Sequence, residues 1–280
     1  MTGDSQGVLY IVGTPIGNLE DLSARARKTL AMVDLVAAED TRRTRGLLSS
    51  IGLNKTLTAY HAHNEARQTA RLLGELKRGS SVALVSDAGT PLISDPGLKL
   101  VHAAIHGHIR VITVPGPSAL IAALSISGLP TERFVFEGFL PRRAAARRAH
   151  LATLQAETRT MVFYEAVHRV EPMIAELNEA FGPERQAAIA RELTKVHESL
   201  ESGTLAELAS RLGDSIPLKG EFVLVVAGAP AAESADGADV RRVFELLHAE
   251  LPATTAAKLT AKLTGMSRND VYRLTQTGVE

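Results

Sequence analysis

The chain has 280 residues with 31 basic and 31 acidic side chains, so its formal net charge at pH 7 is zero and it is no histone-like polycation, although a local basic face is compatible with that total. It contains no cysteine, which excludes disulfide bonds, a thiolate nucleophile and a thiolate metal site and suits a reducing compartment. No apolar run approaches the length of a transmembrane helix and no secretory signal opens the sequence, so we expect a cytoplasmic protein without membrane contact.

The first half of the chain alternates short apolar strands with amphipathic helices, a pattern typical of a parallel sheet covered by helices. Strands are expected at 8–12, 35–38, 56–60, 82–85 and 109–114, and helices at 19–32, 64–77, 98–106 and 120–126. Three loops rich in glycine and proline follow strands, at 13–18, 86–97 and 115–119. Because ligands of open α/β sheets bind outside the carboxyl ends of the strands, we expect a preformed pocket with few charges, suited to a compact organic cofactor.

The loop 86–97 is the centre of this arrangement, since a buried strand runs directly into two glycines, two prolines and two aspartates. Ser118 stands where the next helix begins, and its hydroxyl either caps that helix or leaves room for a bound molecule beside free backbone N–H groups. Neither G-x-G-x-x-G nor a P-loop sequence is present, which argues against a dinucleotide fold or a P-loop hydrolase. His61 and His63 lack a third ligand nearby, so no metal site is expected.

Two charged clusters also follow strands and have two interpretations each. Glu39 and Asp40 precede Arg42 and Arg43, which describes either a solvated helix start or a polar cluster at the mouth of the sheet. The run 191–198 is dense in groups able to hold or move protons, and the alternative is a charged edge hairpin.

The second half continues the alternation with loops of a different character. Strands are expected at 134–136, 160–164, 187–190 and 222–227, with a basic helix over 142–155 and another helix ending near residue 180. In the tail, Ala256, Leu259 and Leu263 are predicted to share one helix face, and Ser267 to cap a further helix after Gly265. The tail resembles a helix-turn-helix-type unit, and a plain helical appendage explains it equally well.

We expect four segments: an N-terminal α/β domain at 1–128 carrying the glycine- and proline-rich loops, a second α/β domain at 129–228, a linker at 229–238 and a small helical domain at 239–280 that is a candidate for RNA binding.

Several motifs together resemble the tetrapyrrole-methylase-like (class III) methyltransferases. The first-half motifs are the segments 13–21, 38–42, 86–97 and 115–119. The second-half motifs are the segments 163–169, 190–198 and 220–222. The resemblance extends over residues 8–226, and it is most specific in the loop 86–97. Thr90 stands where the tetrapyrrole-methylating branch has an acidic residue, which argues against a precorrin substrate.

The resemblance implies two α/β domains that bind S-adenosylmethionine in the cleft between them, in a homodimer. It implies methyl transfer to the ribose 2′-hydroxyl of a decoding-centre cytidine in 16S rRNA. We expect this rRNA to be the partner within the 30S subunit, and free rRNA stays open as the substrate. The cofactor-binding residues that it implies are Pro15, Asp87, Gly89, Thr90, Ile93, Ser118, Ala119, Tyr164 and Gly220.

A ribose hydroxyl is a weak nucleophile at neutral pH, so a positioned base should assist the transfer, although orientation alone can supply much of the rate. The candidate catalytic residues, unranked, are Glu39, Asp40, Lys195 and Glu198. The candidate RNA-binding residues are Arg42, Arg43, Arg142, Arg143, Lys258, Lys262 and Arg268. Two alternatives stay open: a methyltransferase of the same fold acting on a small molecule or a protein side chain, and a non-catalytic RNA-binding module.

Overall fold

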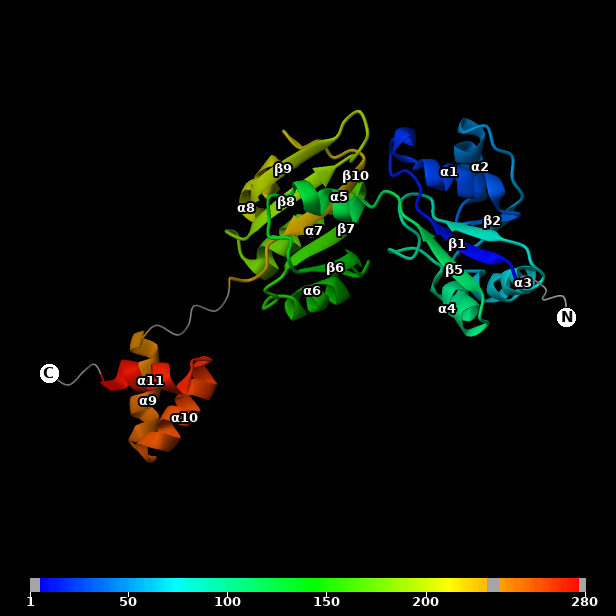
Figure 1. The fold of residues 1–280 in the computed structure, drawn as a ribbon. Helices are drawn as coiled ribbons and strands as arrows, with labels where there is room; N and C mark the ends of the chain where they lie inside the picture. Colours follow the sequence, from blue (N-terminus) through cyan, green and yellow to red (C-terminus); the bar gives the residue numbers. More distant parts are fainter. Residues whose placement is uncertain (1–5, 231–236, 277–280) are drawn as a thin grey trace. The chain divides into compact units, whose positions relative to one another are not determined.

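A computed structural model describes residues 6–230 and 237–276 of the chain. Its contacts divide the chain into two compact units, Met1–Gly228 and Ala229–Glu280. The first unit contains two five-stranded sheets, and the second contains three helices within the described residues (Figure 1). None of the described helices is long and apolar enough to span a membrane.

The first sheet is entirely parallel, as the apolar strand pattern predicts. Its strands lie in the order β3-β2-β4-β1-β5. They are β1 (Val8–Val12), β2 (Leu35–Ala38), β3 (Leu57–Ala59), β4 (Val82–Val85) and β5 (Arg110–Val114). The central strands β2 and β4 are buried at every residue, because helices cover both faces of such a sheet.

Most helices of this half are close to those expected, and a further helix begins at Thr41, where a helix start was one of two interpretations. They are the 3₁₀-helix η1 (Leu19–Asp21), α1 (Ala24–Met32), α2 (Thr41–Ser50), α3 (Glu65–Lys77) and α4 (Leu98–His106). The single helix expected over 19–32 is wrong in one respect, since it is divided into η1 and α1. The division falls where the Ser23 hydroxyl accepts the Ala26 N–H and caps α1.

The second sheet is mixed, with strand order β6-β7-β10-β8-β9. Its strands are β6 (Phe134–Phe139), β7 (Thr160–Ala166), β8 (Gln186–Arg191), β9 (Ser199–Thr204) and β10 (Glu221–Val226). The pair β6–β7 is parallel and the other pairs are antiparallel. Its helices are α6 (Ala144–Thr153), α7 (Val167–Phe181) and α8 (Leu205–Arg211).

The sequence pattern missed β9 and α8. The strand β9 has the sequence SLESGT, without an apolar run, and its place at the edge of the sheet comes from pairing with β8. The helix α8 begins with a capping box between Thr204 and Glu207, which is a signal that the sequence does carry.

The short apolar helix α5 (Ala119–Ile126) packs on the second sheet, although it directly follows the last strand of the first. Leu120 and Leu124 are buried against Val162, Val223 and Val225. The helix thus carries the loop 115–119, at its N-terminus, to the junction of the two halves. The expected boundary at residue 128 falls just beyond its end.

The second unit consists of α9 (Gly237–His248), α10 (Ala253–Thr264) and α11 (Arg268–Gln276). Its small core contains Val240, Ala257, Ala261 and Val271. The helix face predicted for α10 is wrong for Leu263, which is 70% exposed. The buried residues of this helix are instead Ala256, Ala257, Thr260 and Ala261. The expected linker at 229–238 lies largely outside the described residues, which omit 231–236.

Candidate functional site

The three glycine- and proline-rich loops of the first half are joined into one structure. The backbones of Thr14 and Gly89 exchange two hydrogen bonds, at 2.9 and 3.1 Å. The Thr90 hydroxyl donates to the Pro117 carbonyl at 3.1 Å. Loops that follow three different strands are therefore held together by hydrogen bonds, and the surface they form is built before any ligand arrives.

Close backbone contact explains two of the glycines in these loops. A β-carbon on Gly13 would lie 2.7 Å from the Cα of Gly116, so neither position has room for a side chain. In the same region Leu92 and Ser94 have positive φ angles of 74° and 69°. Non-glycine residues in this conformation cost free energy and cluster at functional sites.

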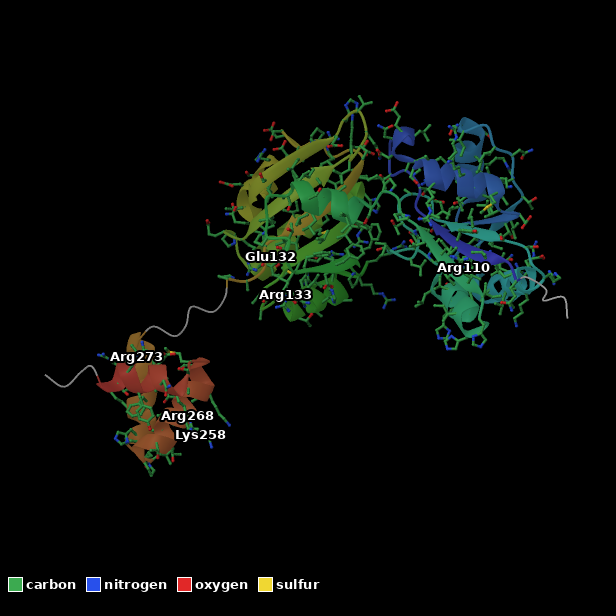
Figure 2. All side chains as sticks on the ribbon, in the orientation of Figure 1. Arg110, Glu132, Arg133, Lys258, Arg268 and Arg273 are labelled. Atoms are coloured by element: carbon green, nitrogen blue, oxygen red, sulfur yellow. The ribbon has the colours of Figure 1, made fainter. Side chains whose placement is uncertain are left out.

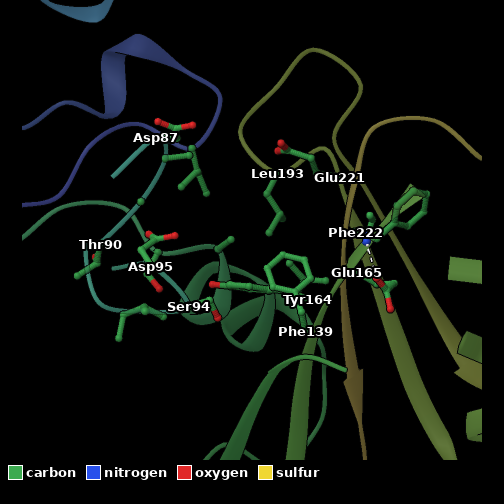
Figure 3. A pocket seen from close by; sticks show the side chains of 18 of the residues that line it. Asp87, Thr90, Ser94, Asp95, Phe139, Tyr164, Glu165, Leu193, Glu221 and Phe222 are labelled. Atoms are coloured by element: carbon green, nitrogen blue, oxygen red, sulfur yellow. Dashed lines mark hydrogen bonds between the residues drawn. The ribbon is translucent and has the colours of Figure 1, made fainter. Parts of the chain in front are cut away.

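A cavity of about 390 Å³ lies over these loops, and the second sheet supplies its opposite wall. Figure 3 shows Asp87, Thr90 and Asp95 on one side and Phe139 and Tyr164 on the other. The lining residues from the first half are Ile16, Glu39, Arg43, Asp87, Ala88, Gly89, Thr90, Ile93, Ser94, Asp95, Ser118 and Ala119. Those from the second half are Phe139, Tyr164, Glu165, Ala166, Leu193, Glu221, Phe222 and Val223.

Seven of the nine residues expected to bind a cofactor line this cavity, and two do not. Those that do are Asp87, Gly89, Thr90, Ile93, Ser118, Ala119 and Tyr164. Pro15 instead lines a neighbouring hollow. Gly220 lines neither hollow. Its φ is +89°, and a β-carbon there would be 2.3 Å from the carboxyl carbon of Glu192. Its role in the structure is to leave space for that carboxylate.

Ser118 and Tyr164 define the edge of the cavity at the start of α5. Ser118 occupies the N-cap position, but its side chain makes no capping hydrogen bond. The Leu120 N–H donates to the Tyr164 hydroxyl at 2.9 Å. The sequence suggested free backbone N–H groups at this helix start, but this one already has a partner. Burial raises the pKa of Tyr164, which keeps the phenol neutral and able to donate a hydrogen bond.

Three carboxylates, Glu39, Asp87 and Asp95, lie on the first-half side of the cavity. Burial and then the charge of Glu39 raise the pKa of Asp95 to about 6. Burial and then the charge of Asp87 raise the pKa of Glu39. Such a group of acids favours a cationic ligand. Among the described residues, no group of side chains could hold a metal ion. The sequence interpretation missed Asp95, whose signal was its place in the same loop as Asp87.

Asp40 and Glu198, both candidate bases, line neither hollow. Asp40 caps α2 by accepting the Arg42 N–H at 2.8 Å, and its hydrogen bonds to Arg42 lower its pKa to about 2. This is the solvated helix start that the sequence left open. Glu198 accepts the N–H of Thr194 and so braces the turn between β8 and β9.

Lys195 lies in that turn between two carboxylates. Its Nζ is 2.7 Å from Glu192 Oε1 and 2.9 Å from Glu221 Oε2. Burial lowers the pKa of Lys195, but hydrogen bonds to the two glutamates raise it above its usual value on balance. Lys195 is therefore a cation at neutral pH. The run 191–198 is both an edge hairpin and a wall of the site.

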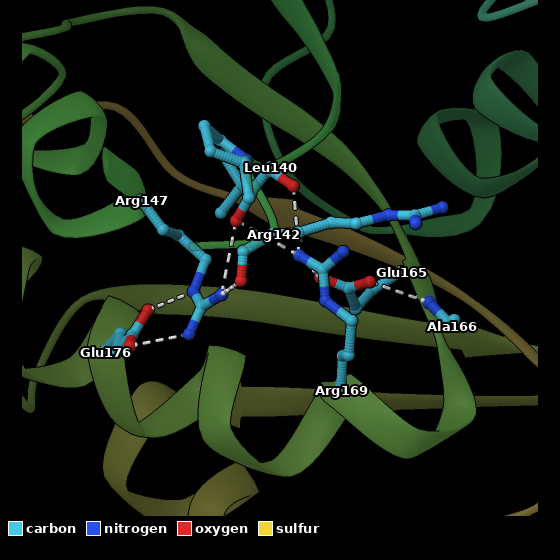
Figure 4. Close-up of polar contacts among 8 residues, drawn as sticks. Leu140, Arg142, Arg147, Glu165, Ala166, Arg169 and Glu176 are labelled. Carbon is cyan, nitrogen blue, oxygen red and sulfur yellow. Dashed lines mark hydrogen bonds and ion pairs between the residues drawn. The ribbon is translucent and has the colours of Figure 1, made fainter. Parts of the chain in front are cut away.

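Two arginines fix the chain after β6, where the cavity wall ends (Figure 4). Arg147 pairs with Glu176 and donates to the carbonyls of Pro141 and Arg142. Arg169 donates to the Leu140 carbonyl at 2.9 Å, and Figure 4 shows it beside the carboxylate of Glu165.

That carboxylate is fully buried and lies 3.1 Å from the Arg169 guanidinium. Since Glu165 belongs to the cavity wall, the ion pair connects the wall to the basic segment that contains Arg142 and Arg143.

The expected RNA-binding residues are all exposed. Arg43 differs from the other six because it lines the cavity, with Nη1 3.6 Å from Asp87 Oδ2. In the second unit, Lys258, Lys262 and Arg268 form no ion pair with any described residue, and Figure 2 shows Lys258 and Arg268 on its helices.

The chain is similar to known proteins over nearly its whole length. Residues 8–209 match the family model of tetrapyrrole (corrin/porphyrin) methylases, and residues 234–277 match that of the RsmI C-terminal HTH domain. The chain is 52% identical over 267 residues to ribosomal RNA small subunit methyltransferase I of Xylella fastidiosa, covering 95% of this chain and 98% of that protein. It is 51% identical over 272 residues to the protein of the same name from Pseudomonas aeruginosa, covering 96% of each.

Among solved structures, uroporphyrin-III C-methyl transferase from Thermus thermophilus, in complex with S-adenyl homocysteine, has a TM-score of 0.56 at 19% identity. That match covers 79% of this chain and 97% of the other, and it supports the two-sheet fold. The chain therefore belongs to the tetrapyrrole (corrin/porphyrin) methylase family, in the branch of the ribosomal RNA small subunit methyltransferase I proteins.

Proposed function

We propose that the chain uses S-adenosylmethionine to methylate the 2′-hydroxyl of a cytidine ribose in the decoding centre of 16S rRNA. The observation that carries this proposal is the 52% identity, over nearly both full lengths, to a named small-subunit rRNA methyltransferase. The cavity between the two halves is the proposed site of the reaction.

The residues of the cavity fit this cofactor. A volume of about 390 Å³ is in the range of small-molecule sites. The carboxylates of Glu39, Asp87 and Asp95 complement a cation, and Ile16, Ile93 and Ala119 offer apolar contacts. When bound, the cofactor supplies an electrophilic methyl group on a positively charged sulfur.

The protein must then orient the ribose hydroxyl in line with the methyl group, which is mainly a positional effect. As the new O–C bond forms and the C–S bond breaks, the hydroxyl proton has to leave. Glu39 is the candidate base that the geometry favours, because it lines the cavity and its raised pKa makes it a better proton acceptor than an ordinary carboxylate. Lys195 is already protonated, and Asp40 has a pKa of about 2.

Exposed basic residues of both units are proposed to hold the RNA. Arg42, Arg43, Arg142 and Arg143 would bind phosphates in the first unit. Lys258, Lys262 and Arg268 would do so in the second, which matches a helix-turn-helix family model. Such contacts make affinity fall as salt rises.

We also propose a cytoplasmic homodimer acting on the 30S subunit, and the four segments expected from the sequence as its domains. Light scattering of the purified chain tests the dimer.

The test of the function is methyl transfer from labelled S-adenosylmethionine to unmethylated 30S subunits, with free 16S rRNA in parallel. We expect label on a ribose 2′-oxygen of the subunit. Label on free rRNA alone would keep the chemistry and move the substrate to an earlier assembly stage. Cofactor binding without label on either would overturn the rRNA assignment in favour of a small molecule or a protein side chain, and RNA binding without cofactor binding would indicate a non-catalytic module.

A further inference from the structure

A second hollow of about 400 Å³ adjoins the cofactor cavity. The two hollows share five lining residues, which are Ile16, Arg43, Asp87, Ala88 and Glu221. One side of the second hollow is a face of α2 that carries Arg43, Gly46, Leu47 and Ser50, and this spacing of three, four and seven residues places them along one side of a helix. The facing side contains Gly17, Leu19 and Lys195.

Two cations of this hollow, Arg43 and Lys195, can contact a phosphodiester, and the carboxylates of Asp87 and Glu221 line it beside them. Lys195 is held as a cation by two glutamates. The Arg43 side chain is 67% exposed, and the 3.6 Å separation from Asp87 leaves most of its donors unused. A guanidinium presents a planar set of donors that matches phosphate oxygens. Leu19 and Leu47 add apolar surface against which a sugar or base can pack.

Gly46 is the most informative residue of this surface. It lies inside the ten-residue helix α2, where glycine weakens the helix relative to alanine. A β-carbon built on Gly46 would meet no atom within 4 Å, so nothing in the protein itself requires a glycine there. The space beside Gly46 is therefore open to a ligand of the hollow, and a larger side chain at this position would occupy it.

We propose that the second hollow binds the target nucleotide of the RNA, with its ribose at the junction with the cofactor cavity and its phosphate between Arg43 and Lys195. This rests on the proposed function, because it assumes a ribonucleotide substrate. The ribose hydroxyl would face the cofactor cavity where the two hollows share their lining residues. Entry of the nucleotide requires it to leave its stack in the RNA, as for other enzymes that act on a single nucleotide.

The test is the full-length Gly46→Leu variant, which fills the hollow without displacing any protein atom at the β-carbon. We expect its affinity for S-adenosylmethionine, measured by calorimetry, to stay near that of the parent, since Gly46 does not line the cofactor cavity. Methyl transfer to 30S subunits should fall by about a hundredfold or more, because the reacting hydroxyl can no longer be positioned. Gly74→Leu is the matched control. It is the same change inside α3, where the nearest atom to a β-carbon is the flexible Arg78 tip at 3.5 Å, and it should leave transfer unchanged.

A second variant tests the charge of Arg43 without filling the hollow. Arg43→Gln should raise KM for subunits and flatten its dependence on salt, and Arg43→Lys should restore part of both. Full transfer by Gly46→Leu on a subunit that the parent labels would overturn the proposed nucleotide site and leave the function intact. A parent that binds the cofactor but labels neither subunits nor rRNA would overturn the function, and the nucleotide site with it.

Discussion

A β-carbon on Gly17 would lie 2.4 Å from Cγ of Lys195, so these residues are in direct contact although they come from opposite halves of the first unit. The same β-carbon would be 3.0 Å from the Leu193 carbonyl. The glycine therefore sets how closely the turn between β8 and β9 approaches the loop after β1. It also determines where the Lys195 ammonium lies.

Gly17→Ala should push Lys195 away from Glu192 or Glu221. We expect kcat/KM for methyl transfer to subunits to fall by about tenfold or more, because a charged group that lines the proposed nucleotide site is displaced. Cofactor affinity should change little, since Gly17 lines only the second hollow. Gly74→Ala serves as the control, and equal kinetics for the two variants would show that the contact has no role in positioning Lys195.

The charge of Asp95 should make cofactor affinity depend on pH. Its pKa is about 6, so raising the pH from 5 to 7 adds a negative charge to the cavity and should tighten binding of the cationic S-adenosylmethionine. In Asp95→Asn this increase should be much smaller. The neutral product S-adenosylhomocysteine is the matched ligand and should show a weaker pH dependence with the parent. Calorimetry at several pH values measures all three, and an unchanged profile in Asp95→Asn would contradict the assignment.

The raised pKa of Asp95 should also make the folding stability depend on pH. Rising pH should lower the stability, whereas it should raise the affinity for the cofactor. The carboxyl of Asp95 ionises near 3.8 in the unfolded chain and near 6 in the folded one. Between these values the folded state binds more protons, so its contribution to stability is present below pH 3.8 and is lost as the pH rises through 6. Urea unfolding at pH 4.5 and 7 should show a smaller loss of stability with rising pH for Asp95→Asn than for the parent. The same loss in both proteins would assign the pH dependence to other groups.

Removing one member of the buried ion pair of Arg147 and Glu176 should lower the stability strongly. The two side chains are 9% and 12% exposed. Arg147→Met should cost about 3–5 kcal/mol, because it leaves the Glu176 carboxylate buried without its partner. Replacing both residues by Met and Leu should recover part of that loss. For comparison, Glu75→Ala removes a surface ion pair with Arg78 and should cost about 0.5 kcal/mol or less. If the costs of Arg147→Met and Glu176→Leu in urea unfolding add up to the cost of the double replacement, Arg147 and Glu176 are not coupled.

The sequence by itself determined the elements whose signals are local. Buried parallel strands such as 82–85 are continuous apolar runs, and the loop 86–97 contains Asp87, Gly89 and Thr90 together, so the first-half wall of the cavity could be located from one stretch. The opposite wall, with Phe139 and Phe222, comes from strands far apart in the chain. Its position depends on packing of the second sheet, which no local pattern specifies. The edge strand β9 was missed for the same reason, since its pairing rather than its composition makes it a strand.

Tertiary structure also decided between neighbours that the sequence treats alike. Glu39 and Asp40 are adjacent acids, yet Glu39 lines the cavity with a raised pKa while Asp40 caps a helix with a lowered one. The start of α2 makes the difference. Asp40 is its N-cap and pairs with Arg42 in solvent, whereas Glu39 precedes the cap and lines the cavity. Burial and partners set the protonation of a carboxyl group, and both are properties of the folded chain.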